Sequence, residues 1–301
     1  LLTELKHTFT EFAQRMKNDE MITLAKFLAI SGIILPMLPH KNLIPDINLT
    51  PYSIWLATVV VSGISYLSYL LKRYVFHESG TLVSGIIGGL YSSTATISVL
   101  ARKSRKASEQ EATDYVAAML LAVSMMFLRF MILILIFSRE IFLSIYPYLL
   151  TMAVVAAIVA WFIHSRQKRP EGQSAETEED DSSNPLEFKV ALIFAILFVI
   201  FTFLTHYTLV YAGTGGLNLL SFVSGFSDIT PFILNLLQNT GSVAALIITA
   251  CSMQAIISNI MVNMFYALFF AGKGSKLRPW ILGGFGVVIV CNLVLLLFFY
   301  I

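Results

Sequence analysis

Two ionisable side chains stand inside apolar stretches of the sequence, where a charge is costly. Asp228 lies in SGFSDITPF, and Arg129 lies in MMFLRFMIL. A charged group at the centre of a membrane-spanning helix costs about 2.5–3.5 kcal/mol on insertion scales, so such residues are functional candidates by default. We therefore expect Asp228 to be the carboxylate, and Arg129 the guanidinium, near the middle of a membrane.

Amides and hydroxyls accompany these charges at helical spacing. Ser258 and Asn259 lie near one face of a later apolar segment, and Asn263 continues the Asn259 line one turn on. Carboxylate, amide and hydroxyl oxygens are the ligands that a hard cation such as Mg²⁺ prefers. The predicted ion- or substrate-binding residues are Asp228, Ser92, Thr94, Asn259, Arg129, Asn263 and Thr230, with Asp228 as the candidate metal ligand. Two structural interpretations stay open: an ion pair between the two charges, and hydrogen bonding between helices through the asparagines.

The composition indicates a membrane protein. Of 301 residues, 57% are hydrophobic and 13% are charged, and the mean hydropathy is +0.78, whereas soluble domains have about 25% charged residues. A net charge of only +2 predicts no nucleic-acid partner. The sequence has no nucleophile elbow, phosphate loop or HExxH zinc motif, so we expect no enzyme and no cofactor apart from a bound divalent cation.

Seven stretches are long and apolar enough to cross a membrane, which needs roughly 20 residues. They lie near 22–39, 53–72, 113–138, 141–163, 187–211, 242–271 and 279–301. Two further segments, 80–101 and 216–238, are long enough to cross but rich in Gly, Ser and Thr. Sliding one onto the other by 136 positions matches Gly89 to Gly225, Ser92 to Asp228 and Thr94 to Thr230. The spans that follow match best at an offset of 127, which predicts a shorter connection in the second copy.

The distribution of Lys and Arg favours re-entrant paths for these two segments. If both return to the side from which they enter, sixteen basic residues outside the spans fall on one side and two on the other, as the positive-inside rule requires of the cytoplasmic side. The predicted fold is therefore an all-α polytopic membrane protein with inverted structural repeats. Each repeat has three spans plus a re-entrant broken helix, and one extra N-terminal span precedes them. Inverted repeats with broken helices that meet near the midplane are typical of secondary transporters.

This fold divides the chain into five parts. They are an amphipathic connector helix at 1–20, the extra span at 21–40, repeat A at 51–164 with its re-entrant segment at 80–101, a disordered cytoplasmic linker at 165–186, and repeat B at 187–301 with its re-entrant segment at 216–238. We expect a multi-pass protein of the inner (plasma) membrane with a cytoplasmic N-terminus.

Glycine, proline and capping residues predict where each re-entrant segment breaks. Gly88, Gly89 and Gly225 are expected at the breaks, with Pro231 in the first turn of a new half-helix. Thr230 is the expected N-cap of that half-helix, and Ser92, Ser93 or Thr94 that of its counterpart. Both half-helix N-termini, each with about half a positive charge, then point at one polar region.

Three strings resemble a known family. GGLYSSTATISVLARKSRK, NPLEFKVALIFA and SGFSDITPF resemble the membrane domain of unknown function that follows the MgtC/SapB domain in many bacterial and archaeal proteins, over about residues 10 to 301. The family commonly has Asp-x-Asp in its second broken segment, where this sequence has Thr230 as the second member, and Asn followed by Lys in the next span, where Asn263 follows Asn259. The resemblance implies an upstream MgtC-like domain as a partner and a link to magnesium physiology.

The sequence thus favours a transporter-like protein that moves an ion, with a divalent cation such as Mg²⁺ as one candidate, or a small solute. It would work by alternating access around the two re-entrant tips. One alternative is a non-transporting membrane module that binds or regulates a partner, and another is a transporter of anionic lipid head groups. The expected partners are the lipid bilayer, the ion or solute, the MgtC-like domain and a second copy of the chain.

The charge distribution generates a test of topology. Single cysteines at Ser104 and Ser174 should be labelled from the cytoplasm by an impermeant thiol reagent, and one at Asn239 from outside, because the re-entrant paths place them there. Labelling of Ser104 from outside would contradict the re-entrant arrangement and the inverted repeat together.

Overall fold

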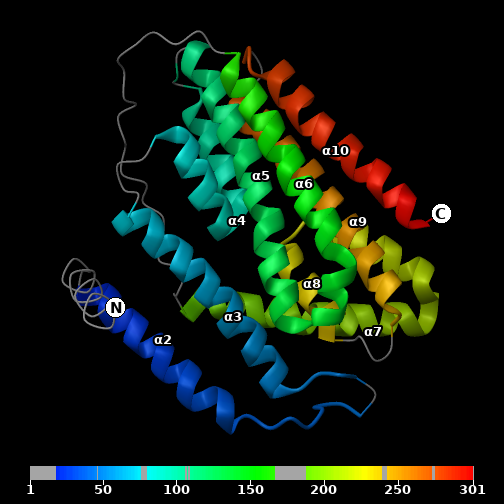
Figure 1. The fold of residues 1–301 in the computed structure, drawn as a ribbon. Coiled ribbons are helices and arrows are strands. Elements are labelled where there is room, and N and C mark those ends of the chain that lie inside the picture. Colours follow the sequence, from blue (N-terminus) through cyan, green and yellow to red (C-terminus); the bar gives the residue numbers. More distant parts are fainter. Residues whose placement is uncertain are drawn as a thin grey trace.

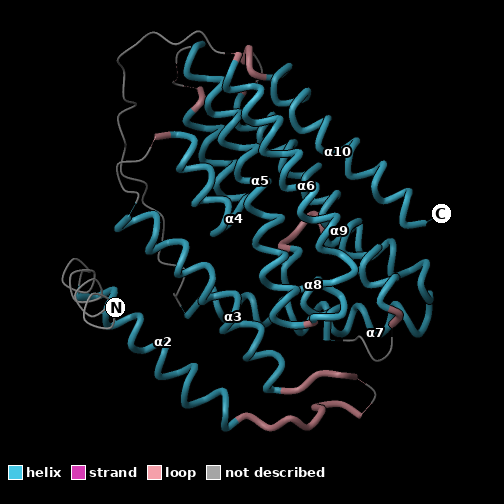
Figure 2. The backbone as a smooth tube through the Cα atoms, in the orientation of Figure 1, coloured by secondary structure: helices cyan, strands magenta, loops and turns pink. Residues whose placement is uncertain are grey.

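A computed structural model of the chain describes residues 18–45, 47–75, 80–105, 107, 109–166, 188–238, 243–272 and 275–300. The described residues are helical apart from loops and one isolated bridge between Ile44 and Ile47 (Figure 2). Residues 1–17 of the predicted connector and residues 167–186 of the predicted linker lie outside the described residues.

The helices follow the predicted spans closely. They are α2 (Asn18–Met37), α3 (Pro51–Leu70) with the π-helical turn η1 (Leu71–Val75), α4 (Thr81–Lys103), α5 (Glu109–Phe137), α6 (Arg139–Ser165), α7 (Phe188–Ser224), α8 (Ile229–Gln238), α9 (Ala245–Ala271) and α10 (Arg278–Tyr300). Within the described residues, eight helices are long and apolar enough to cross a membrane. The chain is therefore a multi-pass helical membrane protein.

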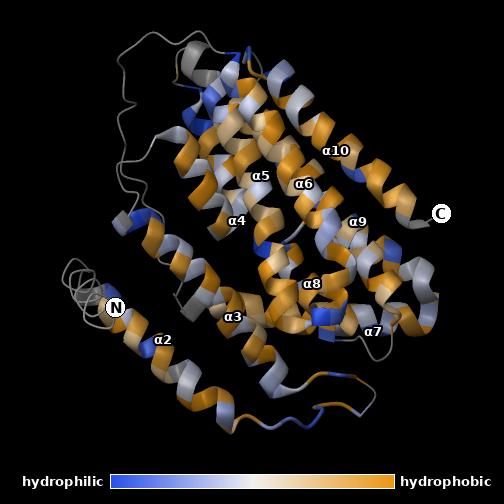
Figure 3. Cartoon of the chain, viewed as in Figure 1, coloured by the Kyte–Doolittle hydropathy of each residue, from blue (hydrophilic) through white to orange (hydrophobic). Residues whose placement is uncertain are grey.

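The outward surfaces of the helices are apolar. Orange, hydrophobic residues cover much of α2, α3 and α10 (Figure 3), and large side chains such as Trp161, Phe265 and Phe298 are more than half exposed. A water-soluble protein rarely exposes apolar patches of this extent, whereas a lipid bilayer solvates them.

Helix α5 forms the centre of the packing. Nearly every residue from Val116 to Ala122 is fully buried, and α5 contacts α4, α6, α8 and α10. Helix α9 packs against α4, α7 and α10, while α2 lies at the edge of the molecule beside α3 (Figure 1).

A buried carboxylate ties α2 to α3. Glu20 is 5% exposed, and its Oε1 accepts a hydrogen bond from the Tyr69 hydroxyl at 2.9 Å and pairs with Arg73 Nη1 at 2.9 Å. Tyr74 donates to the other carboxylate oxygen, and Tyr66 donates to the Glu20 backbone carbonyl. The sequence had placed Glu20 in the connector. Its burial is explained by these partners, because a carboxylate without them would be too costly to bury.

Helix α4 folds back on itself at Ser92. That residue has extended backbone angles (φ −159°, ψ 108°) and separates two half-helices, 81–91 and 93–103. A Cβ on Gly88 would lie 2.5 Å from Thr96 Oγ1, although residues eight apart in a straight helix are about 12 Å apart along the axis. The two half-helices therefore lie side by side.

The first half-helix of α4 runs parallel to α5. A Cβ on Gly85 would lie 2.3 Å from the Ala118 carbonyl oxygen, and one on Gly89 would lie 2.5 Å from the Ala122 Cα. Moving four residues forward in α4, from Gly85 to Gly89, moves the contact four residues forward in α5, from Ala118 to Ala122. Half-helix 81–91 therefore begins at the end of the bundle where α5 begins, and half-helix 93–103 leads back to that end.

Helix α7 also bends, at Gly213. This glycine has φ 59°, a left-handed conformation that glycine adopts without steric cost. Past the bend, a Cβ on Gly216 would lie 2.8 Å from Thr208 Cγ2, so half-helix 214–224 turns back along 188–212. The predicted segment 216–238 is therefore a half-helix, a short loop at 225–228 and helix α8.

The order of helices recurs along the chain at a nearly constant offset. Helices α3, α5 and α6 begin at residues 51, 109 and 139, whereas α7, α9 and α10 begin at residues 188, 245 and 278. The offsets are 137, 136 and 139 residues. The offset of 127 expected for the later spans, and the shorter connection with it, were wrong, because similar strings of small apolar residues occur in more than one register of these helices.

The close contact of α4 with α5 can be tested by adding one methyl group. Gly89→Ala should destabilise the protein by about 1–3 kcal/mol, because the new Cβ overlaps the α5 backbone. Gly283→Ala on α10 is the matched control, since no atom lies within 4 Å of its Cβ position and helix propensity favours alanine by about 1 kcal/mol. Thermal unfolding in detergent measures both, and equal melting temperatures for the two variants would contradict the predicted contact.

Candidate functional site

The first break in the helices is held by a serine cap and an arginine. Ser92 Oγ accepts a hydrogen bond from the Ala95 amide at 3.3 Å and so caps half-helix 93–103. Arg129 Nη1, on α5, donates to the Tyr91 carbonyl oxygen at 2.6 Å. That carbonyl ends half-helix 81–91, where the helix dipole is negative, so a guanidinium there is stabilising.

The second break is capped by an acid. Asp228 Oδ1 accepts a hydrogen bond from the Thr230 amide at 2.9 Å, and α8 begins at Ile229. The prediction of Thr230 as the N-cap was therefore wrong by two residues. The cap lies at Asp228 because a carboxylate satisfies a free amide and also neutralises the positive end of the helix dipole. Asp228 corresponds to Ser92 at the offset of 136, so equivalent positions cap both returning half-helices.

Side chains of α9 hold the loop of the second break. Ser258 Oγ donates to the Phe222 carbonyl oxygen at 2.7 Å, and Asn259 Nδ2 donates to the Gly225 carbonyl oxygen at 3.2 Å. Asn263 Nδ2 donates in turn to Asn259 Oδ1 at 3.1 Å. Asn259 and Asn263 are thus hydrogen-bonded to each other, while Ser258 and Asn259 each bond a backbone carbonyl of the second break.

The two breaks rest on their following helices in the same register. Gly89 contacts Ala122 and Gly225 contacts Ser258, each pair 33 residues apart. Cys251 Sγ lies 3.5 Å from Asn218 Oδ1, again 33 residues apart. Half-helix 214–224 thus runs parallel to α9, as half-helix 81–91 does to α5. The loop of the second break lies at mid-height of the bundle, away from its ends (Figure 2).

Opposite charges stand at the two breaks. Arg129 carries a positive charge at the first and Asp228 a negative charge at the second, and no ion pair joins these two residues among the described contacts. Arg129 is half-buried, and Asp228 is exposed on the protein surface. The interpretation of the two charges as a sealed ion pair is therefore not supported, since the carboxylate stays open to a ligand.

Two buried polar atoms near the breaks have no hydrogen-bond partner in the described part of the chain. They are Arg129 Nε, a donor, and Asn263 Oδ1, an acceptor. An unsatisfied buried polar group costs about 1–3 kcal/mol. A bound solute or water molecule can relieve this cost, so the region has free capacity on both helices that follow a break.

Carboxylates are scarce at this site. No group of three or more His, Cys, Asp or Glu that could hold a metal ion occurs in the described ranges. A cation at Asp228 would therefore take its other ligands from amide, hydroxyl and backbone oxygens, which suits hard cations rather than Zn²⁺.

The remaining predicted residues lie in the same two regions. Thr94 is in the first turn after Ser92 and accepts a bond from Ser98 Oγ at its carbonyl, 2.8 Å away. Thr230 and Pro231 are buried at the start of α8, and Gly88 lies against Thr96. The Tyr91 carbonyl could not be identified from the sequence, because every residue has the same backbone acceptor.

Sequence comparison with known proteins finds a family match that includes both helix breaks. A family model described as "Domain of unknown function (DUF4010)" matches residues 59–271. An "Uncharacterized protein" of Aquifex aeolicus (strain VF5) is 25% identical over 227 residues, which is 73% of this chain and 96% of that protein. No solved structure is detectably similar to the chain. The match agrees with the membrane-domain part of the family resemblance, and the link to an MgtC/SapB domain stays a prediction.

The different tasks of Arg129 and Asp228 lead to different mutational effects. Arg129→Leu should destabilise the protein by about 1.5–3 kcal/mol, because the Tyr91 carbonyl loses a charged donor. Asp228→Asn should have a smaller effect than Asp228→Ala, which loses about 0.5–2 kcal/mol, because asparagine still caps a helix. Thermal unfolding in detergent gives these values.

A double-mutant cycle then measures the coupling between the two charges. We expect a coupling of about 1 kcal/mol or less, since the carboxylate is exposed. A sealed buried pair would instead make removal of one partner cost about 3–5 kcal/mol, most of which the second substitution would restore.

Proposed function

We propose that this chain, which belongs to the DUF4010 family, is a transporter that moves an ion or a small solute by alternating access around its two helix breaks. The observation that carries the proposal is the pairing of those breaks. Each is capped at equivalent positions, Ser92 and Asp228, and each rests on its following helix 33 residues ahead.

An inverted repeat is the arrangement that best explains this pairing. Both ends of α4 lie where α5 begins, which supports a re-entrant path for α4 instead of a full crossing. Repeat A then crosses the membrane three times, an odd number, so repeat B has the opposite orientation. Non-helical backbone at membrane depth is tolerated where it lines a cavity or is buried in protein, and broken helices of inverted repeats bind substrates in many transporters.

The charges at the breaks bear on the substrate. Asp228 offers one carboxylate, and Asn259 and Asn263 offer amide oxygens, which together suit a cation such as Mg²⁺. Arg129 and the half-helix N-terminus at Ser92 attract an anionic group instead. The charges of Asp228 and Arg129 cancel, so a divalent cation would bind at Asp228 more readily if the Arg129 side chain moved away from it.

Alternating access also needs contacts that open at each end of the bundle. At the end where α9 begins, Asn48 Nδ2 donates to the Gln238 carbonyl oxygen at 2.8 Å, which ties α8 to the loop before α3. At the end where α9 finishes, Arg105 Nη2 donates to the Phe269 carbonyl oxygen at 3.2 Å. Both hydrogen bonds are exposed, and each end has one further contact: Gln238 Nε2 donates to the Ser53 carbonyl oxygen at 3.4 Å, and the Arg102 guanidinium lies over the Phe270 ring at 4.4 Å. Few bonds would have to break at either end, so these contacts suit gates.

Ligand stabilisation separates the two chemistries. If Asp228 binds a cation, MgCl₂ at about 100 times its dissociation constant should stabilise the purified protein by about 2.7 kcal/mol, and Asp228→Asn should abolish the shift. If the site binds an anion, sodium phosphate should give the shift and Arg129→Gln should abolish it. Asp114→Asn is the matched control, because Asp114 pairs with His164 at the end of the bundle, at 2.6 Å.

Reconstituted vesicles then distinguish a transporter from a binding module. Flux of the stabilising ion should fall to the level of empty vesicles in the variant that loses the shift and stay normal in Asp114→Asn. Ligand stabilisation without any flux would contradict transport and favour a module that binds or regulates a partner.

The end of α4 offers a more accessible position than Ser104 for the cysteine that reports topology. Ser104 is buried, whereas Arg105 beside it is exposed. A cysteine at Arg105 is therefore the more accessible position, with the exposed Lys41 as the position expected on the opposite side.

A further inference from the structure

The two helix breaks lie at about the same height in the bundle. The second half-helix of α4 packs against α9, and both run toward the end where α5 begins. Near that end the Arg102 guanidinium lies over the Phe270 ring at 4.4 Å. Each helix rises 1.5 Å per residue, so the positions ten residues back, 92 and 260, are level within about one turn. Ser92 of the first break is therefore level with Asn259, which holds the second.

The elements that carry the opposite charges of the two breaks also touch. Helix α8, which Asp228 caps, packs against α5, which carries Arg129. Arg129 Nη1 donates to the Tyr91 carbonyl, directly before Ser92 in the chain, so its guanidinium lies at the first break. One region of the bundle thus contains a cation and an anion on neighbouring helices.

This region also contains a buried donor and a buried acceptor that the described residues leave unpaired. The donor is Arg129 Nε, in the guanidinium that reaches the first break. The acceptor is Oδ1 of the fully buried Asn263, whose amide nitrogen bonds Asn259. An unpaired buried group costs about 1–3 kcal/mol, which a ligand that pairs with it removes.

The caps make the two breaks differ in the charge that they attract. Ser92 is neutral, so its cap brings no negative charge to the positive end of the half-helix that follows. Asp228 brings a full negative charge and is exposed. The first break, with Arg129, therefore attracts an anionic acceptor, whereas the second attracts a cationic donor.

We propose that the substrate of the two breaks is a zwitterion, a small organic solute with one carboxylate and one ammonium group, such as an amino acid. Its carboxylate accepts from Arg129 at the first break, and its ammonium group donates to Asp228 and to Asn263 Oδ1. A simple cation is repelled by Arg129 and a simple anion by Asp228, whereas a zwitterion meets an opposite charge at both ends. This inference rests on the proposed function, because it names the substrate class of the same site.

Zwitterions and their single-charge fragments test the inference on the unmodified protein. Glycine, 3-aminopropanoate and 4-aminobutanoate carry both charges at increasing separation, whereas sodium acetate and methylammonium chloride carry one organic charge each. The rise in melting temperature in detergent, at constant ionic strength, gives an apparent dissociation constant for each compound.

The best zwitterion should bind at least about tenfold more tightly than either fragment, because each fragment lacks one charged hydrogen bond. Equal affinities, tighter binding of a fragment, or no stabilisation by any of the three zwitterions would each overturn the inference.

Substitutions then show which end of the solute binds where. In Arg129→Gln the zwitterion should lose its advantage over methylammonium, and in Asp228→Asn it should lose its advantage over acetate. Asn263→Ala should weaken zwitterion binding about tenfold. Asn292→Ala is the matched control, because Asn292 is equally buried but accepts from the Tyr148 hydroxyl on α6. An unchanged preference in both charge variants would overturn the inference.

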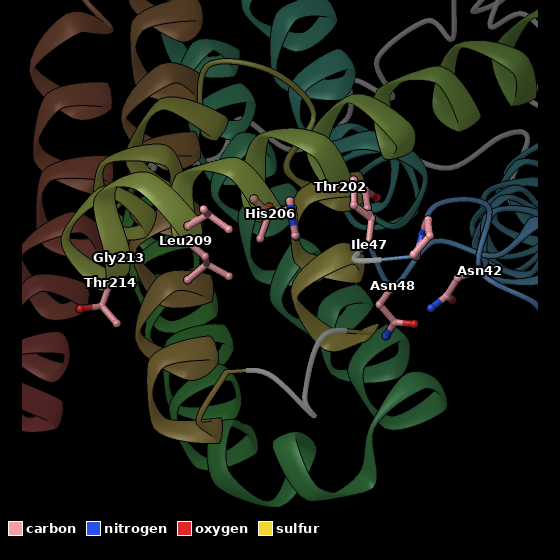
Figure 4. A pocket seen from close by; sticks show the side chains of 11 residues that line it. Asn42, Ile47, Asn48, Thr202, His206, Leu209, Gly213 and Thr214 are labelled. Atoms are coloured by element: carbon pink, nitrogen blue, oxygen red, sulfur yellow. The ribbon is translucent and has the colours of Figure 1, made fainter.

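A cavity beside α7 supplies a second control. Its volume is about 570 Å³, and Thr202 and His206 are among the residues that line it (Figure 4). Arg129, Asp228 and Asn263 are not among its described lining residues. His206→Ala should therefore leave the affinity for the zwitterion unchanged, and a tenfold loss in this variant would contradict binding at the breaks.

Failure of this inference differs from failure of the transport proposal. Stabilisation by MgCl₂ or sodium phosphate without any by a zwitterion would overturn the substrate class and leave ion transport standing. A zwitterion that binds with the expected preference but shows no flux into reconstituted vesicles would support the ligand and contradict transport.

Discussion

The structure depends on one constraint: a helix that breaks in the middle of a bundle leaves backbone amides and carbonyls without their helical partners. Each break in this chain is accordingly surrounded by side chains that pair with those groups. Ser92 and Asp228 accept from free amides, while Arg129 and Asn259 donate to free carbonyls. The polar residues that first suggest a binding site are therefore also the residues that make the fold possible.

The two halves meet this constraint with different chemistry. In the first half the cap is the neutral Ser92, and the positively charged Arg129 donates to the free carbonyl. In the second half the cap is the negatively charged Asp228, and the neutral amide of Asn259 donates to the free carbonyl. The two opposite charges thus belong to different breaks, with no direct bond between them in the described contacts. Together they leave the region without net charge, and Asp228 is exposed.

Close backbone approach brings each break against the helix that follows it. Gly85 and Gly89 let half-helix 81–91 lie directly on α5, and Gly225 lets the second break lie against Ser258. Small residues permit such approach in membranes, where dispersion contacts replace the hydrophobic effect as the main force between helices.

The sequence by itself determined the membrane class, the position of the apolar helices and the offset of 136 between the two broken segments. These follow from local properties, since hydropathy and small-residue content are read along the chain. It also identified Asp228, Arg129 and Asn259, because a polar group in an apolar helix is visible without a structure.

Only the tertiary structure decided what those residues do. It showed that Asp228, and not Thr230, caps α8. It showed that the later helices keep an offset near 136, although sequence matching favoured 127. It also showed that Arg129 bonds to the Tyr91 carbonyl. It also buried Glu20 among tyrosines. These outcomes depend on contacts between residues far apart in the chain. The sequence does not show such contacts, nor which backbone carbonyl is left without a helical partner.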